Sequence, residues 1–145
     1  IATGDTISTE IGLLSKHKPR LITTFKKVES GRSGAITFLG TISGILSICS
    51  IILLAYFLNI NQNYIYLLAA GIGGMIGITI DSYFGATIQA NYICRSCNQL
   101  TESKIHHHRY TNLKNGHAYI DNNIVNLFSI FIGACSSVLL IYLII

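Results

Sequence analysis

Long apolar stretches separated by short polar segments dominate this sequence. No Asp, Glu, Lys or Arg occurs from Ser33 to Ile80 or from Asn122 to Ile145. A helix needs about 20 apolar residues to cross a bilayer, so the first stretch has room for two crossings and the second for one. We therefore predict three membrane-spanning helices with a short polar turn between the first two. The helices cover residues 34–58, 64–88 and 124–145, and the turn covers residues 59–63.

Polar segments flank and connect these stretches. Residues 1–14 contain two acids and several hydroxyl side chains, and we interpret them as the end of a preceding polar helix, with further helices expected before Ile1. Residues 15–33 form a predicted basic loop, and residues 89–123 a loop with cysteines and histidines. The predicted fold is all-α, a single polytopic helical membrane domain over residues 1–145 with about three spans.

The composition agrees with a membrane protein. Of the 145 residues, 50% are hydrophobic and 11% are charged, whereas average soluble domains contain about 25% charged residues. The mean hydropathy is +0.52. Together these values exclude a disordered chain, a coiled coil and an ordinary soluble enzyme.

The positive charge is confined to two loops. The formal net charge is +4 at pH 7, and all ten lysine and arginine residues lie within 15–33 or 89–123. Two crossings return the chain to the side from which it started, so both loops face the same compartment. Basic residues collect on the cytoplasmic side of membrane proteins, so we expect both loops in the cytoplasm. Membrane topology accounts for the charge, and we expect no nucleic-acid partner.

One ionisable side chain interrupts the second predicted helix. Asp81 shares a helical face with Gly77 and Gly85 because these positions recur every four residues. An acid within a span is by default a functional hypothesis, and the alternative is an interfacial acid that reaches water at the helix end. The polar neighbours favour a lined polar site. They are Ser82 and Gln89 in this helix and Asn122 and Asn126 at the start of the third.

The N-terminal segment supplies two further acids. Asp5 and Glu10 lie about 140° apart around an ideal helix, so they serve one site only if the helix is broken or the site wraps around its end. Mg²⁺ is usually held by one or two carboxylates together with substrate phosphates. We therefore predict a Mg²⁺ site at Asp5 and Glu10.

The first basic loop combines cations, hydroxyl groups and glycines. Glycine lets the backbone approach a ligand closely, Lys and Arg neutralise phosphate, and such a turn before a helix is a ready anion site. The alternative is that the charge serves topology alone. The loop is not a Walker A motif, because its residue order differs. The candidate phosphate-binding residues are Arg20, Thr23, Thr24, Lys26, Lys27, Gly31, Arg32, Ser33 and Gly34.

The second loop carries a pair of cysteines and several histidines. Cys94 and Cys97 have the CxxC spacing, and His106 and His108 follow. Two thiolates and two imidazoles suit tetrahedral Zn²⁺, and a small extramembrane unit gains from such a crosslink. We predict a structural Zn²⁺ site at these four residues. The alternatives are free thiols and a surface histidine run.

Five sequence blocks together resemble one integral-membrane family, which includes the plant phytyl-phosphate kinase and the animal transmembrane protein nineteen. They occur in the family's order and span nearly the whole chain. The third block departs from the family pattern, since many relatives have Thr-Asn-Gly-Gly there. The blocks are GDTISTEIG, PRLITT, the basic G-x-x-G block GRSG, DSYFGATIQ and DNNIVN.

The resemblance implies phosphoryl transfer from a nucleotide triphosphate. The acids and the basic loop are also similar in arrangement to those of CTP-dependent dolichol and phytol kinases. The implied reaction converts an isoprenyl monophosphate, phytyl or geranylgeranyl, to the diphosphate at the cytoplasmic face. By this resemblance Asp5 and Glu10 coordinate Mg²⁺ or orient the nucleotide, and Asp81 joins them as a catalytic candidate. In the basic loop, the resemblance implies that the cations hold phosphates and that Gly31 and Gly34 shape the loop; the cations are Arg20, Lys26, Lys27 and Arg32. Asp81 and Gln89 line the acceptor side together with Asn122 and Asn126.

The alternative hypothesis is that the protein is a membrane transporter or a channel-like protein. It is motivated by the intramembrane Asp81 and by the asparagine-rich start of the third helix. A transport site is expected near the bilayer midplane. The polar blocks instead cluster at one membrane face, which favours the kinase hypothesis.

Overall fold

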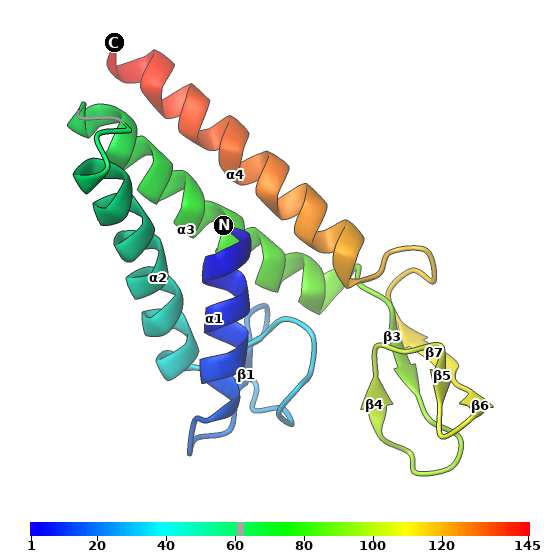
Figure 1. The fold of residues 1–145 in the computed structure, drawn as a ribbon. Coiled ribbons are helices and arrows are strands. Elements are labelled where there is room, and N and C mark those ends of the chain that lie inside the picture. The colour runs from blue at the N-terminus through cyan, green and yellow to red at the C-terminus, as the bar shows by residue number, and fades with distance from the viewer. Residues whose placement is uncertain (61–62) are drawn as a thin grey trace.

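Four helices form the body of the molecule (Figure 1). The computed structural model describes residues 1–60 and 63–145. Three helices have the length and hydropathy to cross a membrane, which confirms the predicted helical membrane protein. The first helix, by contrast, is short. The helices are α1 (Ala2–Leu13), α2 (Phe38–Phe57), α3 (Tyr64–Thr87) and α4 (Asn122–Ile144).

Side-chain caps explain why two spans begin a few residues away from their predicted starts. Thr37 accepts a hydrogen bond from the Gly40 backbone N–H at 3.0 Å. The helix α2 therefore starts only after residues 31–34, here called the glycine loop. Asp121 accepts from the Ile124 N–H at 3.0 Å, which starts α4 two residues earlier than predicted. Both residue types are favourable N-caps because their oxygens satisfy otherwise unpaired N–H groups.

The predicted loops contain short strands. In the first loop β1 (Arg20–Leu21) pairs antiparallel with β2 (Ala35–Ile36). The second loop folds into a small extramembrane unit, residues 91–115, here called the β-unit. Its strands form a three-stranded sheet in the order β4–β3–β7 and the hairpin β5–β6. They are β3 (Asn91–Ile93), β4 (Leu100–Thr101), β5 (Ile105–His106), β6 (Arg109–Tyr110) and β7 (Asn112–Asn115).

Small residues bring the helices together in two pairs. A Cβ atom on Gly73 of α3 would overlap Ser137 and the Gly133 backbone of α4. A Cβ on Gly40 of α2 would lie 2.5 Å from the Ser8 carbonyl oxygen of α1. Such small residues allow close helix contact in membranes, where burial of apolar surface no longer drives association. Figure 1 shows α1 beside α2, and the β-unit at the end of α3 and α4 away from the C-terminus.

Candidate functional site

A polar cavity of about 330 Å³ lies where three helices and both loops meet. Its wall contains α1, the residues leading into α2, the last turns of α3, and the start of α4. Eleven of the residues predicted from the sequence line it. They are Asp5, Glu10, Gly31, Arg32, Ser33, Gly34, Asp81, Ser82, Gln89, Asn122 and Asn126.

The acidic side chains of α1 and α3 meet in this cavity. Asp5 and Asp81 lie close enough for their carboxyl groups to interact directly, and Glu10 lines the same cavity from the next turns of an unbroken α1. Ser129 of α4 donates a hydrogen bond to Asp81 Oδ1 at 3.0 Å. Two ionised carboxylates in contact repel each other, so the arrangement favours a cation between them.

The glycine loop forms another part of the cavity wall and is fixed against α3. Gly34 has φ +71°, and a Cβ there would overlap the Ala86 backbone. The neighbouring Ser33 is buried, and its hydroxyl oxygen lies 2.6 Å from Glu102 Oε1 and 2.8 Å from Asn91 Oδ1. The loop is therefore held between a membrane helix and the β-unit.

One buried side chain in the wall has an unused hydrogen-bond donor. Gln89 is 3% exposed, and its Nε2 has no partner among the residues that the structure describes. Buried polar groups are nearly always hydrogen-bonded, so such a group requires an explanation. An acceptor atom of a ligand in the cavity would supply the missing partner.

Two helix N-termini also border the cavity. Thr37, the N-cap of α2, lines it, and so does Asn122, the first residue of α4. The first N–H groups of a helix lack partners within the helix, and the helix dipole adds partial positive charge at that end. Together with Arg32 these N-termini provide donors for an anion, while Glu102, beside Ser33, adds a carboxylate to the same part of the wall. Asp5, Glu10 and Asp81 provide carboxylates for a cation.

Part of the predicted phosphate-binding set lies elsewhere. Arg20 donates from Nη1 to the Phe25 carbonyl at 2.9 Å, because this segment forms its own turn beside β1. The remaining members of the set are exposed. The structure does not bring the following residues to the cavity wall: Arg20, Thr23, Thr24, Lys26 and Lys27.

The structure adds wall residues that the sequence did not single out. Ser8 and Thr9 of α1 and Thr37 before α2 line the cavity. Their hydroxyl groups beside the acids were the signal that could have identified them from the sequence. Glu102 also lines it. Nothing in the sequence indicated this, because the fold of the β-unit decides which of its residues reaches the membrane helices.

The comparisons with known proteins place the chain in a family. Residues 1–134 match the family described as Integral membrane protein DUF92. The chain belongs to this family. The five blocks that indicated an integral-membrane family are thereby confirmed at the family level.

Two relatives illustrate the similarity of this chain to known proteins. An uncharacterized membrane protein of Methanocaldococcus jannaschii is 46% identical over 88 residues, which cover 61% of this chain and 36% of the relative. Protein PGR of Arabidopsis thaliana is 33% identical over 146 aligned positions, which cover 89% of this chain and 47% of the relative. The chain thus spans less than half the length of either relative. No solved structure matches it.

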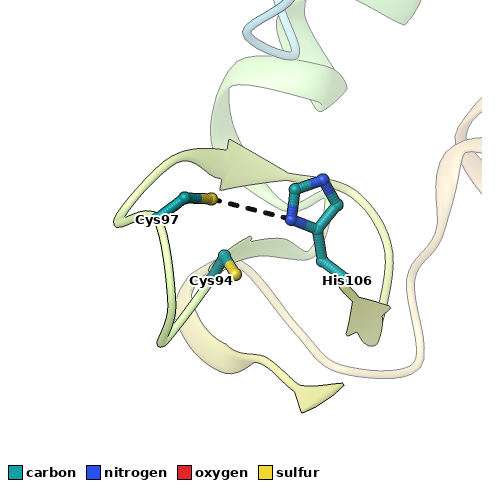
Figure 2. A group of neighbouring side chains, drawn as sticks. All are labelled: Cys94, Cys97 and His106. Atoms are coloured by element: carbon teal, nitrogen blue, oxygen red, sulfur yellow. Dashed lines mark hydrogen bonds between the residues drawn. The ribbon is translucent and has the colours of Figure 1, made fainter. Parts of the chain in front are cut away.

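A second chemically distinctive cluster lies in the β-unit of this DUF92 chain (Figure 2). The ligand atoms of Cys94, Cys97 and His106 all lie within 4.8 Å of one another, and His108 is outside this group. The pKa of the Cys94 thiol is lowered to about 6, mainly by its hydrogen bond with the His106 side chain. Backbone N–H groups of Cys97 and Ser96 lower this pKa further. The Cys94 thiol therefore ionises more readily than an ordinary cysteine thiol.

Proposed function

We propose that this DUF92 protein is a membrane-bound phosphotransferase that uses CTP to phosphorylate an isoprenyl monophosphate, phytyl or geranylgeranyl. The γ-phosphoryl group would pass from the nucleotide to a terminal phosphate oxygen of the lipid, giving the lipid diphosphate and CDP. One observation carries the proposal: acids, an arginine and a glycine-hydroxyl loop surround one cavity at the end of the membrane helices. Phosphoryl transfer mainly requires positioning and neutralisation of charge.

The acidic wall is suited to Mg²⁺. Asp5, Asp81 and Glu10 provide carboxylate oxygens on one side of the cavity, and Mg²⁺ is usually bound through one or two carboxylates and the phosphates of a substrate. Bound Mg²⁺ supplies charge that offsets the phosphate oxygens. The protein would fix the ion through Asp5 and Asp81, whose mutual repulsion the ion relieves.

The hydrogen-bond donors of the cavity wall are suited to phosphate groups. Arg32 offers a charged donor, the α2 and α4 N-termini face the cavity, and Gln89 has its free Nε2. Because these donors lie in one cavity, they can serve the phosphates of both substrates only if both substrates bind there. We expect both basic loops in the cytoplasm, and we therefore expect the nucleotide and the lipid phosphate to enter from that side.

An apolar groove between two membrane helices is suited to the lipid chain. It lies between α2 and α3, has a volume of about 440 Å³ and exposes only apolar atoms. Ile48 lines this groove and also packs against Gly4, the neighbour of Asp5. A prenyl chain in the groove would hold its phosphate near the acidic wall.

The proposal is tested by a transfer assay with the full-length protein in detergent. With Mg²⁺, [γ-³²P]CTP and phytyl or geranylgeranyl monophosphate, labelled lipid diphosphate should accumulate, and EDTA should stop it. If no nucleoside triphosphate supports transfer to either lipid, the proposal is wrong. Flux of solutes from liposomes in the same preparation would instead favour the transporter hypothesis.

Replacing Arg32 with alanine should weaken nucleotide binding more than replacing Lys27. Arg32 lines the cavity and Lys27 does not, and a hydrogen bond to a charged group contributes about 1.5 kcal/mol or more. We therefore expect R32A to raise the KM for nucleotide about tenfold and K27A to raise it about twofold or less. Equal effects would indicate that long-range charge, and not contact within the cavity, attracts the nucleotide.

A further inference from the structure

We propose that Cys94, Cys97 and His106 bind a Zn²⁺ ion that holds the β-unit in place against the polar cavity. This inference does not depend on the phosphotransferase proposal. It concerns a second site, formed entirely within the extramembrane part of the chain.

The first pair of ligands lies on a tight turn between β3 and β4. The Cys94 N–H donates to the Gln99 carbonyl at 3.0 Å, and the Asn98 N–H donates to the Cys94 carbonyl at 3.0 Å. Asn98 adopts φ +55° to close the turn. The Ser96 N–H donates to Cys94 Sγ at 3.4 Å. The turn thus brings both sulfur atoms to one side and directs a backbone dipole at one of them, which stabilises a thiolate.

The third ligand comes from the β5–β6 hairpin. His106 pairs with Arg109 across a two-residue turn formed by His107 and His108. Both turn residues have positive φ, 52° and 58°, where Asn and Gly are the usual residues. A histidine backbone in this region is unfavourable and requires compensation from its surroundings. The turn directs the His106 ring toward the two cysteines, as Figure 2 shows.

The distances are those of a metal site. Zn–S bonds of about 2.3 Å and Zn–N bonds of about 2.0 Å in a tetrahedron place ligand atoms about 3.5–3.8 Å apart. Cys97 Sγ and His106 Nδ1 lie 3.8 Å apart, and all three ligand atoms fall within 4.8 Å of one another. Small side-chain rotations therefore suffice to coordinate the ion. The fourth position is left to water or to the adjacent His107–His108 turn.

The β-unit has too small a core to hold this arrangement by packing alone. Its strands contain two to four residues, and all four residues of β7 are exposed. Of the hydrophobic residues in the β-unit, Tyr92 and Cys94 have buried side chains. Small units of this kind usually need a disulfide or a metal, and within the described residues the four cysteines are unpaired thiols.

A metal in this position would act on the cavity through β4. Glu102 directly follows β4 and accepts from the Ser33 hydroxyl of the glycine loop at 2.6 Å. Asn91, at the start of β3, lies within 2.8 Å of the same hydroxyl. The ion at one end of the β3–β4 hairpin would therefore keep these two contacts aligned at the other end.

The test measures metal content and thiol protection in the full-length protein. Purified wild type should contain about one Zn²⁺ per chain. Mass spectrometry should show that iodoacetamide modifies Cys94 and Cys97 roughly several-fold faster after chelation, because a thiolate that binds the metal is not free to act as a nucleophile. Protein that stays free of zinc after dialysis against it, with alkylation rates unchanged by chelator, would overturn the proposal.

Variants with matched controls complete the test. Cys97 and His106 are not fully buried, so C97S and H106A should lose the zinc while α2, α3 and α4 stay folded. C135S, in a membrane helix, and H117A, outside the β5–β6 hairpin, should keep it. If C97S and H106A retain zinc at the wild-type level, these residues are not the ligands. Because the readout is metal content, inactive protein would not affect the conclusion.

Discussion

Replacing Asp81 with asparagine should reduce phosphoryl transfer about 100-fold or more, which corresponds to about 3 kcal/mol of transition-state stabilisation. The amide has nearly the shape of the carboxylate but no charge to hold Mg²⁺ beside Asp5. It still accepts the hydrogen bond that Ser129 donates to this side chain, so the fold should persist. The rate of labelled diphosphate formation at saturating CTP measures the effect.

Asp121 provides the matched control for this change. It lies at the start of α4, caps that helix through Ile124, and is not part of the cavity wall. Asparagine is an equally good N-cap, so D121N makes the same chemical substitution without removing the cap or altering the acidic wall. We expect D121N to retain wild-type activity. If D81N is as active as D121N, Asp81 takes no part in transfer, and the acidic wall has another role.

Replacing Gly34 with alanine should destabilise the protein by about 3 kcal/mol. The left-handed backbone conformation accounts for about 1–2 kcal/mol, and the overlap of the new Cβ with the Ala86 backbone for about 1–3 kcal/mol. Backbone atoms of a helix cannot rotate away as a side chain can. Thermal unfolding in detergent, followed by loss of helical circular dichroism, measures the change.

Gly31 separates the two contributions. It has φ +82°, but a Cβ there meets nothing within 4 Å. G31A should therefore show only the conformational penalty, about 1 kcal/mol. If G31A and G34A destabilise the protein equally, the contact between the glycine loop and α3 contributes nothing, and the loop is not held as described.

The spans and the acidic wall were predictable because charge is so scarce in this chain. The charge-free stretches located α2, α3 and α4 to within a few residues, and their ends depended on the caps Thr37 and Asp121. Asp81 stood out because an acid in a span is unfavourable unless it has a partner. The predicted separation of Asp5 and Glu10 around α1 is compatible with one site because the cavity extends along that helix.

The loop residues were harder to assign, for a physical reason. Composition showed that cations and hydroxyl groups surround the glycines, but the pairing of β1 with β2 decides which of them face the cavity. Arg32 does, whereas Lys26 and Lys27 do not. Glu102 reaches the cavity through the β-unit, whose strands are too short to leave a periodic signal. Long-range contacts of this kind cannot be inferred from local sequence.

The hydroxyl group of Ser33 has one hydrogen and two neighbouring acceptors, Asn91 and Glu102. It therefore links the glycine loop, which packs on the membrane helix α3, to the extramembrane β-unit. If a cavity ligand changes the affinity of the β-unit for its metal by some factor, the metal must change the affinity for that ligand by the same factor, because binding free energies are reciprocal. Occupancy of either site would therefore change the binding affinity of the other, although the two sites share no ligand.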